Sequence, residues 1–208
     1  MTRYKLHILA IQEHTPWNRE LSDGEVKSIH KHCESLGYFA TVTKLQILIT
    51  DKQMWASHRD SRHLEDGRII HSRYEVSSSQ HASFISLYGV PHHGGEKTQY
   101  SSRDVEESTT LQKMIAVKNQ LKSIIREAKR NNDIIFVFGD LQDVPDNSSN
   151  FQYGQCKIPK HPLGIVKTCE DLQLTCSIYK FLHTLDTPII SRHGSKGGRF
   201  NDGMFVWD

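Results

Sequence analysis

Two acidic side chains stand directly after apolar runs that have the composition of buried strands. Residues 134–138 form a continuous run of β-branched and aromatic residues, and Gly139 ends this run just before Asp140. Far away in the sequence, residues 5–11 form a second, largely apolar run that is followed closely by Glu13. Carboxylates bind hard cations such as Mg²⁺ and orient water for attack. If both strands end at the same edge of a sheet, the two acids predict metal-assisted hydrolysis.

Each of these motifs also has an ordinary explanation when it is taken alone. A strand that leaves a sheet commonly ends in polar residues because the chain meets water there. Glu13 and Asp140 could be no more than such residues. The chemical interpretation therefore depends on whether the elements around them bring the two acids together.

The elements that must position these acids alternate between helices and strands, which predicts an α/β domain. A polar start at Ser22, apolar residues at helical spacing and a final Gly37 predict the first long helix. An apolar stripe predicts a second helix over 108–130, formed by Leu111, Met114, Ile115, Val117, Leu121, Ile124 and Ile125. Strands are expected at 38–43, 45–50, 68–76, 81–90 and 134–138, with 68–76 and 81–90 joined as a hairpin.

Two polar segments favour solvent exposure. Residues 51–67 carry His58, Arg59, Arg62 and His63, and they predict an exposed loop. The far face of the 108–130 helix carries a row of cations, which is more typical of a solvated face than of a nucleic-acid groove. The row contains Lys113, Lys118, Lys122, Arg126 and Lys129.

The motifs around the two acids resemble the endonuclease/exonuclease/phosphatase superfamily. This group includes deoxyribonuclease I-like enzymes, apurinic-site nucleases and retrotransposon endonucleases. Residues 11–13 (Ile-Gln-Glu) are similar to the family's strand that ends in Gln-Glu, and residues 139–142 (Gly-Asp-Leu-Gln) to its Gly-Asp-Phe/Leu-Asn. Residues 84–91 resemble its Asn-x-Tyr-x-Pro strand end, and residues 199–206 resemble its Arg-Ile-Asp-Tyr-Ile strand.

The resemblance implies a role for each matching residue. Glu13 would hold the metal ion, Mg²⁺ or Mn²⁺, and Asp140 would position the attacking water. Gln142 and Tyr88 would contact the phosphate, and Asp202 would orient the catalytic histidine. These roles require Glu13, Tyr88, Asp140 and Asp202 to surround a common pocket.

The sequence also departs from the family pattern. The family's first strand carries an Asn that has no counterpart here, and its final Ser-Asp-His is not matched before Asp208, so no residue aligns with the catalytic histidine. His193 is a candidate for that role and for binding substrate. Gln142 replaces an Asn, and Ser86 replaces the Asn before Tyr88. We therefore expect residues 1–208 to form one partial domain that lacks the family's first and last strands.

The fold that the resemblance implies is a four-layer α/β/β/α sandwich of the deoxyribonuclease I type. Its activity would be that of a Mg²⁺-dependent phosphodiesterase cleaving a nucleic-acid backbone, DNA rather than RNA, with weak activity and a retrotransposon-type endonuclease as the nearest kind. Two alternatives remain open. One is a phosphatase of small phosphoesters or of inositol or lipid phosphates on the same fold, and the other is a non-catalytic relic or binding domain.

Composition and charge set limits on the class of protein. With 37% hydrophobic and 24% charged residues, the chain is too apolar for a disordered segment and too polar for a membrane protein. A net charge of +2 permits nucleic-acid binding without indicating it. The four cysteines show no Cys-x-x-Cys spacing, so we expect reduced thiols. No signal peptide or membrane-spanning run is evident, which favours an intracellular protein, either nuclear or cytoplasmic.

Overall fold

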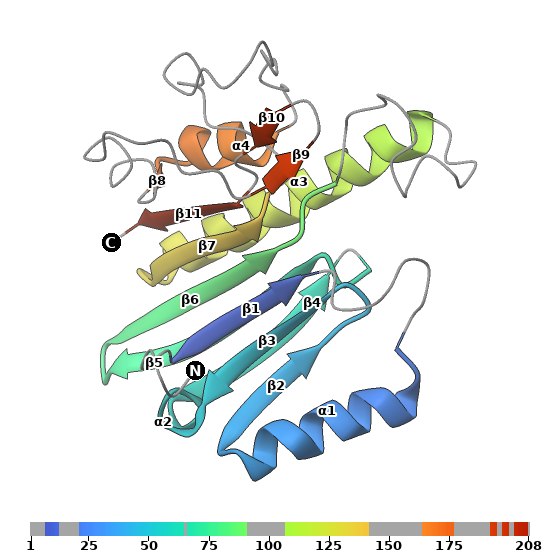
Figure 1. The fold of residues 1–208 in the computed structure, drawn as a ribbon. Coiled ribbons are helices and arrows are strands. Elements are labelled where there is room, and N and C mark those ends of the chain that lie inside the picture. Colours follow the sequence, from blue (N-terminus) through green and yellow to red (C-terminus); the bar gives the residue numbers. More distant parts are fainter. Residues whose placement is uncertain are drawn as a thin grey trace.

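The computed structural model describes residues 7–12, 21–64, 66–90, 107–141, 164–176, 192–194, 197–199 and 202–207. The strands form two main sheets with helices beside them, which confirms the predicted α/β class (Figure 1). The smaller sheet has the order β1-β3-β2 and is antiparallel throughout. Its strands are β1 (Ile8–Gln12), β2 (Tyr38–Val42) and β3 (Gln46–Asp51).

The larger sheet has six strands in the order β4-β5-β6-β7-β11-β8. Only β6 and β7 run parallel to each other in this sheet, and the long helix α3 connects them. Its strands are β4 (His58–Leu64), β5 (Ile69–Ser77), β6 (Gln80–Leu87), β7 (Ile134–Asp140), β8 (Thr175–Cys176) and β11 (Asp202–Trp207). A separate two-stranded hairpin consists of β9 (Arg192–Gly194) and β10 (Gly197–Arg199).

The first predicted helix is confirmed as α1 (Asp23–Ser35), and its two ends form as the sequence indicates. Ser22 and Glu25 make a capping box: the Ser22 hydroxyl oxygen accepts from the Glu25 N–H at 3.3 Å, and the Ser22 N–H donates to the Glu25 carboxylate at 2.9 Å. Gly37 follows the helix with φ of +76°, a backbone conformation that suits glycine. α1 packs beside β2 in the smaller sheet (Figure 1).

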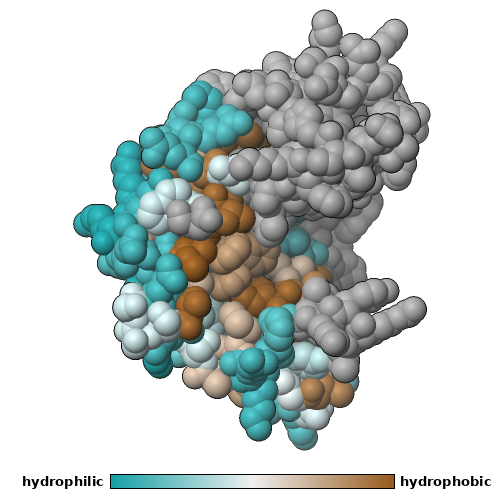
Figure 2. All heavy atoms as spheres, turned by 90° about the vertical axis from the view of Figure 1, so that its left-hand side faces the viewer, coloured by the Kyte–Doolittle hydropathy of each residue, from teal (hydrophilic) through white to brown (hydrophobic). Residues whose placement is uncertain are grey.

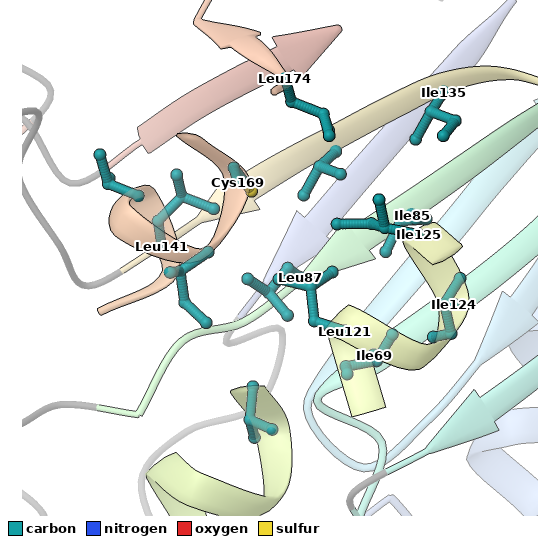
Figure 3. Close-up of a cluster of buried hydrophobic side chains, with 14 of the residues drawn as sticks. Ile69, Ile85, Leu87, Leu121, Ile124, Ile125, Ile135, Leu141, Cys169 and Leu174 are labelled. Carbon is teal, nitrogen blue, oxygen red and sulfur yellow. The ribbon is translucent and has the colours of Figure 1, made fainter. Parts of the chain in front are cut away.

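The second predicted helix is confirmed as α3 (Glu107–Arg130), and it covers one face of the larger sheet (Figure 1). Its buried side chains meet those of β5, β6 and β7, and the short helix α4 (Ile165–Asp171) extends the same core (Figure 3). Leu111 and Ile115 were expected in the apolar stripe, but they are 44% and 40% exposed. The buried stripe instead continues toward the C-terminal end of the helix, where Ala128 joins it.

The prediction of an exposed loop over residues 51–67 was wrong. This stretch contains α2 (Lys52–Ala56) and then β4, which pairs with β5 along the hairpin. Asp51 starts α2 because its carboxylate accepts from the Met54 N–H at 2.8 Å. β4 is polar because it is the edge strand of its sheet, and charged side chains on an edge disfavour pairing with another chain.

Aromatic rings connect the two sheets. Phe39 of β2 stacks on Trp55 of α2 at 4.8 Å between ring centroids, and Trp55 stacks on His58 of β4 at 4.1 Å. Across the larger sheet, Tyr74 meets Phe84 edge to face at 5.5 Å. Aromatic pairs of this kind each contribute about 0.5–1.5 kcal/mol beyond the burial of their area. The helix α2, which the sequence did not indicate, therefore fastens one sheet to the other.

The surface opposite the ends of β1, β6 and β7 shows how polarity is distributed. Figure 2 views this face, and apolar surface occupies its middle, with hydrophilic side chains to the left of it and below it. A bilayer-spanning helix, which must be both long and apolar, is not found in the part of the chain that the structure describes.

A buried histidine makes the stability of the fold depend on pH. His71 of β5 is 2% exposed, its Nε2 lies 3.1 Å from the Ser83 hydroxyl, and Arg62 Nε donates to its Nδ1 at 3.3 Å. Burial, followed by the charge of Arg62, lowers the pKa of His71 to about 4. An unfolded histidine protonates near pH 6.5, so protons favour the unfolded chain between these two values.

We expect stability to be complete above about pH 6.5 and to fall by about 3 kcal/mol as the pH drops toward 4. Urea denaturation at several pH values measures this change. Because carboxylates titrate in the same range, the comparison is between the wild type and His71→Gln, which should lose this part of the pH dependence. Equal slopes for the two proteins would contradict the prediction.

Candidate active site

Three strands end at one rim of the molecule, and a fourth begins there. β1, β6 and β7 all end on the right-hand side in Figure 1. β11 starts at the same place, because Asp202 lies opposite Asp140 in the antiparallel pairing of β11 with β7. The Gly89 N–H, just after β6, donates to the Asp140 carbonyl oxygen at 2.8 Å. The backbone at Asp140 is therefore fixed from both neighbouring strands.

The residue before Glu13 and the residue before Asp140 are in close contact. A Cβ placed on Gly139 would lie 3.1 Å from the Gln12 amide nitrogen and only 2.1 Å from the Leu87 carbonyl oxygen. Gly139 also has φ of +135°, which side-chain-bearing residues rarely adopt. β1 and β7 therefore converge through a point where only glycine fits. The ends of β1 and β7 do converge, but they belong to two different sheets and do not share one sheet edge as predicted. Glu13 itself lies outside the described residues.

A chain of hydrogen-bonded polar side chains holds the end of β1 in place. The Gln12 amide donates to the Ser86 hydroxyl at 3.3 Å, and the Ser86 hydroxyl donates to the Gln46 side-chain oxygen at 2.7 Å. The Gln46 amide then donates to the Gly67 carbonyl oxygen at 2.9 Å. Gln46 and Ser86 are both fully buried. Because buried polar groups cost free energy unless they are paired, this chain fixes β1 and β3 against β6.

Tyr88 lies at the rim but faces the interior. Its side chain is fully buried, and the Arg68 guanidinium lies over its ring at 5.1 Å from the centroid. Arg68 also donates to the Gly89 carbonyl oxygen at 2.9 Å, and the Tyr88 N–H donates to the Arg68 carbonyl oxygen at 2.8 Å. Arg68 therefore holds the segment that contacts Asp140. The role of Tyr88 at a phosphate stays a prediction, and it would require the ring to become accessible.

The other predicted site residues are described incompletely. Asp140 is half-buried at the end of β7. Asp202 is placed in β11 and His193 in β9 by their backbones, but their side chains lie outside the description, as do Glu13 and Gln142 entirely. Among the described side chains, no group of three or more His, Cys, Asp or Glu residues could hold a metal ion. The predicted metal site therefore depends on Glu13 and stays a prediction.

Sequence reasoning missed three residues that build the rim: Gln46, Arg68 and, in its observed role, Ser86. Ser86 was matched to the Asn of the family's Asn-x-Tyr-x-Pro strand end, but its hydroxyl hydrogen-bonds with Gln12 and Gln46. Arg68 is recognisable in the sequence only as a cation directly before the apolar pair Ile69 and Ile70. A buried Arg needs hydrogen-bond acceptors, so an Arg in this position predicts contacts with backbone carbonyl groups nearby.

Comparison with known proteins finds similarity in structure. No protein-family model matches the sequence, and no curated protein matches it either. Among solved structures, the 3′-5′ exonuclease NExo from Neisseria meningitidis superposes with a TM-score of 0.63 and 16% identity, over 96% of this chain and 76% of that one. A second NExo structure, described as a 3′ phosphatase, is bound to a product DNA hairpin.

Two further structures extend the comparison. ANGEL2, a 2′,3′-cyclic phosphatase, gives a TM-score of 0.56 at 12% identity, over 98% of this chain and 70% of that one. Humanized D. rerio TDP2 gives 0.54 at 11% identity, over 99% and 71%. The chain has the fold of the endonuclease/exonuclease/phosphatase superfamily. Since the identities are all low, the similarity to these superfamily members concerns the fold and leaves the activity to be argued from the site.

Proposed function

We propose that this protein is a Mg²⁺- or Mn²⁺-dependent phosphodiesterase acting on nucleic acid, built on a four-layer α/β/β/α sandwich. The observation that carries the proposal is the close approach of the Gln12 side chain to Gly139, because Glu13 follows Gln12 in the sequence and Asp140 follows Gly139, so the two acids would lie close together. Two carboxylates placed this way are a donor set that suits a hard, oxygen-seeking cation. A nucleic-acid substrate is supported by the superfamily members of similar structure, one of which contains a DNA product.

Each site residue has a defined task in this proposal. Glu13 would hold the cation, which when bound supplies positive charge at the phosphoryl oxygens. Asp140 would orient a water molecule for in-line attack and accept its proton, and its position is fixed by the Gly89 N–H and by β11. Gln142 and Tyr88 would donate hydrogen bonds to the phosphate.

The remaining proposals concern the basic partner of Asp202 and the type of substrate. Asp202 would orient a basic partner, for which His193 is the candidate. The loose motifs and the modest net charge of +2 favour an endonuclease of the retrotransposon type with weak activity, on DNA before RNA. An enzyme that lacks its general acid or base is commonly slower by roughly 100-fold or more. The assay must therefore be sensitive to slow cleavage.

The test is nicking of supercoiled plasmid and of a duplex with one apurinic site, in Mg²⁺, in Mn²⁺ and in EDTA. We expect slow cleavage that needs the metal, and Asp140→Asn should reduce its rate about 100-fold because the water loses its proton acceptor. The matched control is Asp171→Asn in α4, an exposed carboxylate whose pair with Lys167 contributes little.

Two results would decide against the proposal. Equal rates for the wild type and Asp140→Asn would show that any cleavage arises elsewhere. Hydrolysis of soluble phosphoesters or inositol phosphates without any action on nucleic acid would favour the phosphatase alternative on the same fold. Absence of every metal-dependent hydrolysis would leave the binding-domain alternative.

A further inference from the structure

Arg68 is a buried cation that none of the proposed tasks uses. It directly precedes β5 and is only 9% exposed. A guanidinium stays charged when it is buried, so it needs hydrogen-bond acceptors around it. Its Nη1 donates to the carbonyl oxygens of Gly89 at 2.9 Å and of Tyr88 at 3.4 Å, and the guanidinium lies over the Tyr88 ring. Arg68 is therefore bound to the segment that follows β6.

One peptide group joins Arg68 to Asp140. The carbonyl oxygen of this group belongs to Tyr88 and accepts from Arg68. Its N–H belongs to Gly89 and donates to the Asp140 carbonyl oxygen at 2.8 Å. Hydrogen bonds in such a chain polarise one another, so each one strengthens the next. The backbone of Arg68 holds the same segment, because its carbonyl oxygen accepts from the Tyr88 N–H at 2.8 Å.

Asp140 depends on this contact because the sheet is irregular beside it. The parallel ladder between β6 and β7 ends with the pair of Ser86 and Phe138. Gly139 follows with φ of +135°, which is far from the extended conformation of a strand. The hydrogen bond from Gly89 to Asp140 lies beyond this interruption. It therefore restores the link between the ends of β6 and β7.

The turn before β5 also supports the end of β1. The Gly67 carbonyl oxygen accepts from the Gln46 amide at 2.9 Å, and Gln46 is joined through Ser86 to Gln12 of β1. Gly67 and Arg68 are neighbours in the chain. The ends of β1 and β7 therefore depend on one short segment, which contacts β1 through Gln46 and β7 through Gly89.

We propose that Arg68 is a positioning residue for Asp140. The inference rests on the proposed function, in which Asp140 orients the attacking water. Arg68 acts through the peptide group between Tyr88 and Gly89 and does not contact the phosphate. It should therefore affect the rate of cleavage and leave the binding of substrate unchanged. A displacement of about 1 Å in a reacting group can cost roughly 100-fold in rate, so a buried residue of this kind has a large effect.

The first experiment makes the same substitution at the two ends of β7. Arg68→Lys keeps the charge but loses the planar guanidinium that lies over Tyr88. Arg73→Lys is the matched control, since Arg73 also belongs to β5 but binds Asp133, directly before the other end of β7. With enzyme in excess over supercoiled plasmid, in Mg²⁺ or Mn²⁺, Arg68→Lys should cleave about 10-fold more slowly than the wild type. Arg73→Lys should cleave at the wild-type rate.

A binding measurement separates positioning from direct contact with the substrate. Arg68→Met removes both the charge and the donors of the side chain. Its affinity for fluorescein-labelled single-stranded DNA, followed by anisotropy in EDTA, should equal that of the wild type, because the loss concerns the rate alone. Weaker binding would make Arg68 a ligand of the phosphate and would overturn the positioning role.

A third measurement needs no hydrolysis at all. Amide hydrogen exchange of the Gly89 N–H, followed by NMR, reports directly on its hydrogen bond to Asp140. In Arg68→Met we expect this amide to exchange about 10-fold faster than in the wild type, while the Ile85 N–H in the middle of β6 exchanges as before. If Arg68→Met does not fold, Arg68→Lys should show the same change to a smaller extent.

The outcomes distinguish this inference from the proposed function. Equal exchange at Gly89 in the wild type, Arg68→Lys and Arg68→Met overturns the inference. A loss of cleavage rate that Arg73→Lys shares also overturns it, because the cause would then be a general loss of stability. Faster exchange at Gly89, in a protein whose wild type cleaves no substrate, supports the link from Arg68 to Asp140 while refuting the hydrolase.

Discussion

Replacing Gly139 by alanine is expected to destabilise the fold by about 4 kcal/mol and to displace Asp140. The new methyl group would lie 2.1 Å from the Leu87 carbonyl oxygen, which is backbone and cannot rotate away. A backbone at φ of +135° adds strain of about 1–3 kcal/mol for a side-chain-bearing residue, and overpacking typically adds about 1–3 kcal/mol more. Urea denaturation at pH 7.5 measures the loss.

Gly37→Ala is the matched control for Gly139→Ala. Gly37 also has a positive φ, +76°, but a Cβ there would meet no atom within 4 Å. Gly37→Ala should lose only about 1 kcal/mol of stability, which is the cost of the positive φ for a residue other than glycine. If the two alanine variants were equally stable, the close approach of β6 to β7 at Gly139 would not be the cause of the lost stability. In variants that fold, nucleic-acid cleavage should fall for Gly139→Ala and stay unchanged for Gly37→Ala.

Arg73→Leu is expected to cost about 3–5 kcal/mol, because it leaves a carboxylate buried without its countercharge. Asp133 is 1% exposed. Arg73 donates to both of its carboxylate oxygens, from Nε at 2.8 Å and from Nη2 at 2.7 Å. Ser83 adds a third hydrogen bond at 2.8 Å. Burial acts to raise the pKa of Asp133, but the hydrogen bonds from Arg73 and Ser83 outweigh it and hold the pKa below its usual range.

Without Arg73, the contribution of Asp133 to stability should change with pH in the opposite direction to its contribution in the wild type. In the wild type, the pair's stabilisation is present above the pKa of an unfolded carboxyl, about 3.9, and is lost as the pH falls through the lower folded value. Without Arg73, burial should raise the folded pKa of Asp133 above the unfolded value. The deficit of Arg73→Leu against the wild type should therefore be larger at pH 7.5 than at pH 5.

Two controls accompany this measurement. Arg59→Leu breaks an exposed pair with Glu75, which should cost no more than about 1 kcal/mol. The double variant Arg73→Leu/Asp133→Asn removes the charge that the single variant leaves buried, so part of the stability should return. A single variant no less stable than Arg59→Leu would contradict this account of the buried pair.

The sequence predicted those parts of the fold that depend on local patterns. The apolar run before Gly139 became β7, the capping signals at Ser22 and Gly37 bounded α1, and residues 68–90 formed the expected hairpin. These elements are specified by periodicity and by capping residues that lie close together in the chain. The approach of the ends of β1 and β7 was also anticipated, because acids that follow buried strands tend to meet at strand ends, although the two strands belong to different sheets.

The features that sequence reasoning missed depend on partners far away in the chain. The polarity of β4 is that of a sheet edge, and which strand lies at an edge cannot be recognised from its own residues. Ser86 meets Gln12 and Gln46 from 74 and 40 positions away, so its buried role was not visible in its motif. Leu111 and Ile115 matched a helical stripe, but the sheet beneath α3 does not extend far enough to cover them.

The position of β7 determines when the rim is completed during folding. β5 and β6 are neighbours in sequence and can pair early, whereas β7 must find β6 across the whole of α3, and β11 must find β7 across more than sixty residues. Closing long loops is entropically expensive before the contacts form, so such pairings form slowly. Asp140 lies between the two late pairings. We therefore expect the candidate catalytic centre to form together with the core that α3 and β7 share, and later than the β5–β6 hairpin.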